Sequence, residues 1–196
     1  DAGVEVSLLR TDGSATGHAI IQVAESGENA IILHGGANRE ITAAEAAETL
    51  AGFSSGDLLL LQNEISAIPE IMRLARTRGM TVAFNPAPLG PEVSAYPLEC
   101  VNTFILNEIE GAQLAGAAAP EMIIATLRHR FPTAEIVLTL GAAGVRFANA
   151  ECLLTVPAER VKAVDTTAAG DTFIGYFLAR RTAGDEIESS LRLACR

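Results

Sequence analysis

The sequence predicts an α/β fold, in which a mainly parallel β-sheet lies between two layers of helices and a small β-hairpin is added. From residue 42 onward, short apolar runs typical of buried parallel strands alternate with segments of helical periodicity. This alternation is typical of a three-layer αβα arrangement. The 196 residues are 49% hydrophobic, enough for one sizeable core, and no repeat or low-complexity segment divides them. We therefore expect residues 1–196 to form one domain.

The hairpin is expected over residues 17–34. Two apolar runs, at residues 19–23 and 30–33, flank the turn-rich stretch 25–29. Two short apolar strands joined by a glycine-containing turn form the usual pattern of a β-hairpin.

The alternating elements begin with a helix whose first turn carries the capping-box pattern Thr42-Ala43-Ala44-Glu45. The expected strands lie at residues 58–62, 81–85, 101–106, 135–140, 145–148 and 152–156. The expected helices lie at residues 67–78, from about 108, at about 120–130 and from about 169.

Both ends of the sequence look cut. The chain starts at Asp1 without a methionine. At the other end, an amphipathic helical pattern that includes Ile187 and Leu191 is still running where the sequence stops at Arg196. We therefore expect a fragment of a longer protein.

Charge and cysteine content exclude several classes of protein. The net charge is −10 and Lys162 is the only lysine, which argues against nucleic acid or an anionic membrane as the main partner. An anionic nucleotide would therefore be held by backbone amides and metal. Cys100, Cys152 and Cys195 are odd in number and lack zinc-type spacing, as expected for free thiols in a reducing cytoplasm. With no signal peptide and no apolar run of roughly 18 residues, we expect a cytosolic protein.

Polar residues follow the expected strands at four places. They are Asn63 with Glu64, Asn85, Asn107 with Glu110, and the segment 139–144. In sheets of this kind, ligands bind beyond the carboxyl ends of the strands. These four sets should therefore lie along one edge of the sheet and supply the binding site.

The segment from Thr166 to Thr172 places small residues and one carboxylate where a helix begins. The first N–H groups of a helix have no partners inside it and lie at the positive end of its dipole, so Ala168, Ala169 and Gly170 leave room for a phosphate. Asp171 could accept a proton from an attacking hydroxyl, as a kinase acting on an alcohol requires. The alternative is that Asp171 only complements the helix dipole.

Asn107 and Glu110 lie one helical turn apart at the start of a helix. Glu110 could orient the hydration shell of Mg²⁺ while Asn107 contacts phosphate, because Mg²⁺ keeps most of its waters and needs few carboxylates. The alternative is a capping box with Asn as N-cap and Glu at the third helical position.

The segment Thr139-Leu140-Gly141-Ala142-Ala143-Gly144 leaves a strand and enters a turn. Its glycines would let the backbone approach a nucleotide closely. A turn that only connects two strands would need the same glycines, so the pattern alone leaves both interpretations open.

Together these motifs resemble the ribokinase family of carbohydrate kinases, also called the PfkB family. The resemblance rests on six segments in family order: Thr16-Gly17, Gly35-Gly36-Ala37-Asn38, and residues 85–88, 107–110, 139–144 and 165–173. Family members also carry an amino-terminal double-glycine motif and a carboxyl-terminal segment that lines the adenine pocket. Neither occurs here, which agrees with a fragment that lacks both ends.

The resemblance implies an ATP-dependent kinase that phosphorylates ribose at its O5 hydroxyl. Within the family, the alternatives for this protein are a fructokinase and a nucleoside kinase. A non-catalytic sugar- or nucleotide-binding regulator on the same fold is a further alternative. The hairpin at residues 17–34 would be a lid, which also pairs with the lid of a second subunit to form a homodimer.

The resemblance also implies a role for each matching residue. Asp171 would be the base and contact the sugar together with Glu64, and the amides of Ala168, Ala169 and Gly170 would form the anion hole. The nucleotide-binding residues would be Asn107, Thr139, Leu140, Gly141, Ala142, Ala143, Gly144 and Gly170. Glu110 would hold Mg²⁺ through water, and Asp165 and Thr167 would contribute to a K⁺ site.

Overall fold

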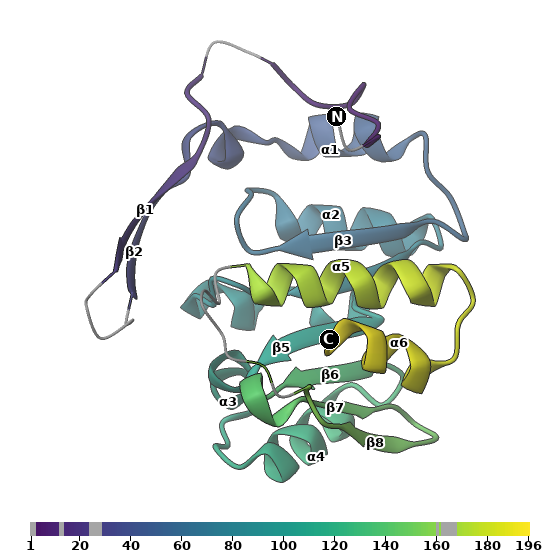
Figure 1. The fold of residues 1–196 in the computed structure, drawn as a ribbon. Coiled ribbons are helices and arrows are strands. Elements are labelled where there is room, and N and C mark those ends of the chain that lie inside the picture. The colour runs from purple at the N-terminus through teal and green to yellow at the C-terminus, as the bar shows by residue number, and fades with distance from the viewer. Residues whose placement is uncertain (1–2, 12–13, 24–28, 160, 162–167) are drawn as a thin grey trace.

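The computed structural model describes residues 3–11, 14–23, 29–159, 161 and 168–196. Its main sheet has six strands in the order β3-β4-β5-β6-β7-β8 (Figure 1). Their bounds are Leu58–Gln62 (β3), Thr81–Asn85 (β4), Thr103–Asn107 (β5), Glu135–Thr139 (β6), Val145–Ala148 (β7) and Leu153–Val156 (β8). The first four are mutually parallel, whereas β7 and β8 are antiparallel to their neighbours.

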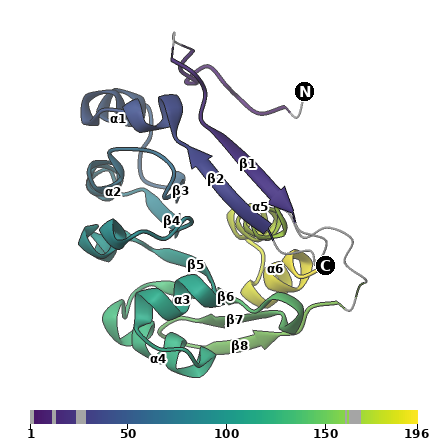
Figure 2. The same cartoon turned by 90° about the vertical axis from the view of Figure 1, so that its left-hand side faces the viewer.

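Helices cover both faces of this sheet. They are α1 (Ala43–Leu50), α2 (Ile68–Thr77), α3 (Glu108–Ala115), α4 (Pro120–Arg130), α5 (Ala169–Thr182) and α6 (Ile187–Ala194). Figure 2 shows α1 to α4 on one side of the strands and α5 with α6 on the other. The predicted three-layer α/β fold is therefore confirmed. Among the described helices, none is long and apolar enough to cross a membrane.

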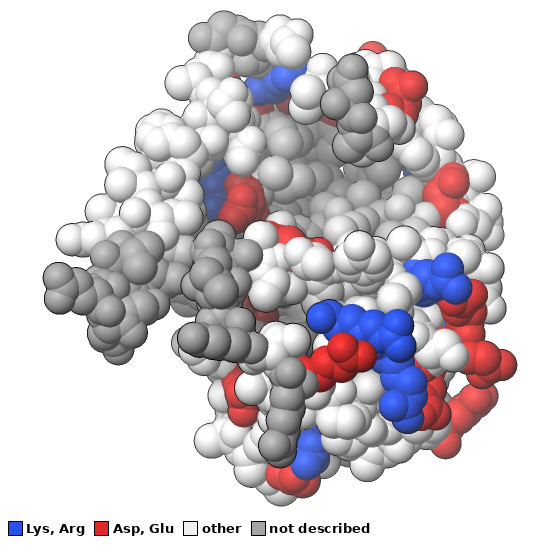
Figure 3. All heavy atoms as spheres, in the orientation of Figure 1, with Lys and Arg blue, Asp and Glu red and all other residues white. Residues whose placement is uncertain are grey.

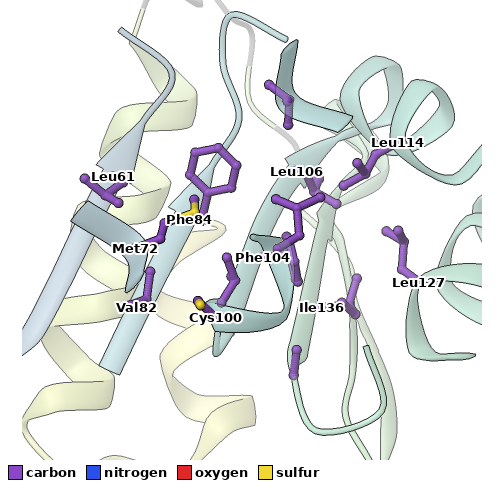
Figure 4. Close-up of a cluster of buried hydrophobic side chains, with 14 of the residues drawn as sticks. Leu61, Met72, Val82, Phe84, Cys100, Phe104, Leu106, Leu114, Leu127 and Ile136 are labelled. Carbon is purple, nitrogen blue, oxygen red and sulfur yellow. The ribbon is translucent and has the colours of Figure 1, made fainter. Parts of the chain in front are cut away.

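The larger of the two cores lies between the sheet and the layer of α1 to α4. Figure 4 shows Phe84, Phe104 and Ile136 of the strands facing the same space as Met72 of α2 and Leu127 of α4. These five side chains are almost completely buried. On the other face, Phe173 and Phe177 of α5 pack in the second core, as their helical spacing predicts.

One expectation about burial was wrong. The leucine run of β3 suggests a buried parallel strand, yet Leu61 is its only buried residue and Leu60 is 43% exposed. The reason is position, because β3 lies at the edge of the described sheet and pairs only with β4 there. A cavity of about 720 Å³ separates β3 from α1 and is visible as a hollow in Figure 3.

The predicted hairpin is confirmed as β1 (His18–Val23) and β2 (Asn29–His34), which are antiparallel. It projects on the side where α5 begins and toward which β3, β5 and β6 point (Figure 1). Isoleucines are exposed on both of its faces: Ile20 and Ile32 on one, and Ile21 and Ile31 on the other. Apolar side chains in this position can cover a site at the sheet edge or contact another molecule.

Short 3₁₀ helices were not predicted. They occupy Gly36–Glu40, Pro91–Ala95, Leu98–Cys100 and Gly141–Ala143. Segments of three to five residues are too short to show a helical period, so the sequence predicts them only as turns or loops. The last of them shortens the expected strand 135–140 by one residue.

The predicted capping box of α1 is present and gives a prediction for pH dependence. The Glu45 carboxylate accepts hydrogen bonds from the Thr42 hydroxyl and N–H and from Arg10, and they lower the pKa of Glu45 from 4.5 to about 2. A lowered pKa means that this stabilisation of the α1 N-terminus is present above pH 4.5 and is lost as the pH falls toward 2. We expect NMR titration of the Glu45 side chain to show a midpoint near 2.

Thr42→Ala is the control for this titration, because it removes the largest cause of the shift. In that variant the pKa of Glu45 should move back toward 4.5. A midpoint near 4.5 in the unsubstituted chain would contradict the capping geometry.

Candidate active site

The carboxyl ends of the parallel strands gather the predicted polar residues at one edge of the sheet. Register places Gln62 at the end of β3 beside Asn85 at the end of β4. In the same way, Asn107 of β5 lies beside Thr139 of β6. The prediction that these sets lie along one edge is therefore confirmed, and α5 begins at the same edge because Asp171 contacts Gln62.

Asp171 lies in the first turn of α5 and is exposed. One of its oxygens, Oδ1, accepts a hydrogen bond from Nε2 of Gln62 at 3.1 Å. The carboxylate is not directed into the protein interior, so it is accessible to a ligand at the sheet edge. Its position also complements the helix dipole, and both interpretations of Asp171 agree with this geometry.

The first turn of α5 is open. Ala168 is its N-cap, with φ of 59°, and makes no side-chain cap hydrogen bond. The N–H groups of Ala169 and Gly170 have no acceptor within the helix, and both residues are exposed. A Cβ atom built on Gly170 would meet nothing within 4 Å. Among the described residues, no atom near Gly170 would obstruct an anion that approaches these N–H groups.

Asn107 and Glu110 form the complete capping box of α3. The Glu110 N–H donates to Asn107 Oδ1 at 2.8 Å, and Glu110 Oε2 accepts from the Asn107 N–H at 2.9 Å. A third bond joins Asn107 Nδ2 to Glu110 Oε1 at 2.8 Å. Burial raises the pKa of the Glu110 carboxyl, while hydrogen bonds from Asn107 and Asn85 oppose that effect.

The capping alternative is thus realised, and it leaves limited capacity for a ligand. Asn107 keeps one amide hydrogen, and Glu110 Oε1 can accept a further hydrogen bond, whereas Oε2 already accepts two. No group of three or more Asp, Glu, His or Cys side chains in the described ranges could hold a metal ion directly. Glu110 therefore fits Mg²⁺ only in the way expected from the sequence, as one carboxylate acting through the metal's waters.

A continuous hydrogen-bond chain joins Asp171 to Glu110. Gln62 Nε2 donates to Asp171 and also to Asn85 Oδ1 at 2.9 Å. Asn85 Nδ2 in turn donates to the Ile105 carbonyl at 2.8 Å and to Glu110 Oε2 at 3.3 Å.

The sequence analysis did not identify Gln62 as a site residue. Its place at the last position of a strand in the same parallel set was the signal that could have identified it.

Asn63 is not available to a ligand, although its place after β3 suggested that role. Its side chain is 1% exposed and its Nδ2 donates to the Pro88 carbonyl and to Glu92, both at 2.8 Å. Its Oδ1 accepts from the Tyr96 hydroxyl at 2.9 Å. The bond from Asn63 also lowers the pKa of Glu92. Asn63 therefore ties the loop at Pro88 to β3, whereas Glu64 beside it is exposed.

The two glycines of the segment 139–144 lie in different surroundings, one fitting a tight connection between strands and the other fitting an open backbone. Gly144 has φ of +97°, and a Cβ atom on it would lie 2.1 Å from the Val156 carbonyl oxygen, so the connection to β7 requires glycine there. Gly141 has φ of +54° and nothing within 4 Å of its Cβ position. Residues 141–143 are exposed at the sheet edge, where their backbone is open to a ligand.

Asp165 and Thr167, the expected K⁺ ligands, lie outside the described residues.

Comparisons with known proteins agree with the fold described above. Residues 1–196 match the family described as pfkB family carbohydrate kinase. The chain is 34% identical over 210 residues to the ribokinase of Schizosaccharomyces pombe, in an alignment covering 99% of this chain and 64% of that protein.

Two solved structures show the same fold. The first is a ribokinase from Cryptococcus neoformans var. grubii serotype A in complex with ADP, with a TM-score of 0.79, 29% identity, and coverage of 94% of this chain and 65% of that one. The second is Arabidopsis thaliana ribokinase complexed with ribose and ATP, with a TM-score of 0.77, 26% identity, and coverage of 94% and 62%. The chain therefore spans slightly less than two thirds of the length of these relatives.

Proposed function

The chain belongs to the pfkB family of carbohydrate kinases, and on that premise we propose that the protein phosphorylates a sugar hydroxyl with ATP, with ribose as its acceptor at O5. The observation that carries the proposal is the open first turn of α5 with Asp171 exposed beside it. The relatives named ribokinase, and the similar structures with ADP or with ribose and ATP, support the choice of substrates.

Asp171 acts as the base in this proposal. Its carboxylate takes the proton from the O5 hydroxyl as that oxygen forms a bond to the γ-phosphorus, and the bond from this phosphorus to the bridging oxygen of ADP breaks. ADP leaves with the electron pair of that bond. The N–H groups of Ala168, Ala169 and Gly170 stabilise the negative charge on the transferring group, at the positive end of the α5 dipole.

The remaining site residues orient the two substrates. Glu64 accepts hydrogen bonds from sugar hydroxyls, and the open backbone of residues 139–144 lies against the nucleotide. Asn107 has one amide hydrogen left for a phosphate oxygen. Glu110 holds Mg²⁺ through water, and the bound ion would neutralise phosphate charge. Asp165 and Thr167 contribute to a K⁺ site, a role that rests on the family resemblance.

The β1–β2 hairpin serves as the lid over this site. Its two apolar faces allow two functions, since one face can exclude water from the reacting groups and the other can bind the hairpin of a second copy. We propose a homodimer formed in this way, acting in the cytoplasm.

A substrate panel tests the proposed function. ATP-dependent ADP formation is measured in the full-length protein, including any residues that flank these 196, with ribose, fructose and adenosine as acceptors. We expect the highest kcat/KM with ribose. Preference for fructose or adenosine would instead assign a fructokinase or nucleoside kinase, and sugar binding without turnover would assign a regulator.

Gly170→Ala should separate activity from stability. Alanine is the better helix former by about 1 kcal/mol, and its methyl would meet no atom of the described residues within 4 Å, so the free energy of unfolding should rise by up to about that amount. The same methyl would lie where the phosphoryl group approaches, so we expect kcat to fall at least about tenfold, the equivalent of 1.4 kcal/mol. Steady-state kinetics and chemical denaturation measure the two effects.

Gly175→Ala is the matched control, because Gly175 lies in the same helix and a Cβ there also meets nothing within 4 Å. It should give a similar gain in stability and leave kcat unchanged. Full activity in Gly170→Ala would contradict the proposal that the first turn of α5 binds the transferring phosphoryl group.

A further inference from the structure

We propose that Gln62 is a positioning residue for Asp171, and that its orientation is dictated by the buried carboxylate of Glu110 through Asn85. This inference rests on the proposed function and deepens it. The observation behind it is the hydrogen-bond chain that runs from the exposed end of α5 to the buried start of α3.

The direction of the chain is fixed at its buried end. Glu110 Oε2 and the Ile105 carbonyl offer acceptors, and only the NH₂ group of Asn85 can donate to both of them. Asn85 is 7% exposed, so a flipped amide would leave its oxygen facing two acceptors away from water. Asn85 Oδ1 must therefore point toward Gln62.

The same reasoning fixes Gln62. Its Nε2 carries two hydrogens, and one goes to Asn85 Oδ1 while the other goes to Asp171 Oδ1. If this amide flipped, its oxygen would oppose both an amide oxygen and a carboxylate. Gln62 thus always offers a donor to Asp171, even though 109 residues separate them in the sequence. The carboxylate is held by one oxygen, and its other oxygen, which has no hydrogen bond from the described residues, can receive a proton.

Asp171 needs such support because nothing else in the described part of the chain is recorded as a side-chain partner for it. Asp171 lies in the first turn of α5, whose N-cap Ala168 makes no side-chain hydrogen bond, and it is exposed. A hydrogen bond to an ionised carboxylate is stronger than one between neutral groups, and it restricts the rotamer of an exposed carboxylate. Gln62 therefore connects the base to the rigid end of β3.

The test is kinetic and uses Gln62→Met, which keeps the side-chain length and removes both donors. We expect kcat for the sugar to fall about tenfold while KM for ATP stays within about twofold, since the base is misplaced and the nucleotide contacts are kept. Gln62→Glu, which keeps the size and removes the donors, should fall at least as far. Gln113→Met on the exposed side of α3 is the matched control and should keep full activity.

A double-mutant cycle distinguishes positioning from general damage. In an Asp171→Asn background, Gln62→Met should cause little further loss, because the residue that it positions no longer acts as a base. Equal losses in both backgrounds, or wild-type kcat in Gln62→Met, would overturn the inference while leaving the kinase proposal intact. If the unsubstituted protein phosphorylates no sugar, the proposed function fails and the role of Gln62 fails with it.

Discussion

Asp171→Asn is expected to lower kcat by about 10³- to 10⁴-fold, the upper part of the range for loss of a general base. Asparagine has nearly the same shape, and its oxygen can still accept the bond from Gln62, so the start of α5 should keep its geometry. What it loses is the capacity to take a proton from the attacking hydroxyl. Coupled assays of ADP formation measure kcat, and calorimetry measures the affinity for ATP, which should change little.

Asp185→Asn is the control for this experiment. Asp185 follows the other end of α5 and pairs with Arg180, so the substitution also removes one carboxylate next to the same helix. It should leave kcat unchanged. If Asp171→Asn keeps more than a tenth of the activity, Asp171 is not the base, and its carboxylate only complements the helix dipole.

Asn63→Ala is expected to lower the free energy of unfolding by about 3 kcal/mol, because it removes three hydrogen bonds of a buried side chain and each typically contributes roughly 0.5–1.5 kcal/mol. The substitution removes the partners of the Tyr96 hydroxyl, the Pro88 carbonyl and the Glu92 carboxylate in one step. Urea denaturation measures the change. A destabilisation below about 0.5 kcal/mol, the level of an ordinary surface substitution, would mean that these bonds do not hold the loop.

Tyr96→Phe provides the comparison, since it removes only the hydroxyl and keeps the ring against Phe84. It should cost about 1 kcal/mol, the usual net contribution of one hydrogen bond. The double variant should be less destabilised than the sum of the single variants, because both lose the same bond.

Most elements of the fold could be predicted because their signals are local. The bounds of β3, β4, β7 and α4 agree with the sequence prediction, since each is a short apolar run or an amphipathic segment between clear turn residues. The burial of β3 could not be predicted in this way. A run of leucines looks the same whether a strand is covered on both faces or lies at an edge, and only the sheet order decides between them.

The same distinction between local and long-range signals applies to the candidate site. Strand ends identified Asn85, Asn107 and Glu110 as neighbours, because parallel strands carry their carboxyl ends to one edge. The sequence could not show that Asn63 is fully used within the protein or that Gln62 bonds Asp171, since each depends on contacts between distant segments. Side chains of similar polarity at adjacent positions thus have opposite roles, one structural and one at the site.

The outer edge of β3 has a practical consequence for anyone who produces these 196 residues alone. A leucine-rich strand whose outer edge pairs with no other strand among the described residues is the kind of surface on which molecules add to one another, giving soluble oligomers and then precipitate. Leu60→Lys would place a charge at the centre of that edge and should keep such a preparation in solution. Poor solubility of the 196-residue polypeptide would then reflect this strand rather than a fault in the site at its end.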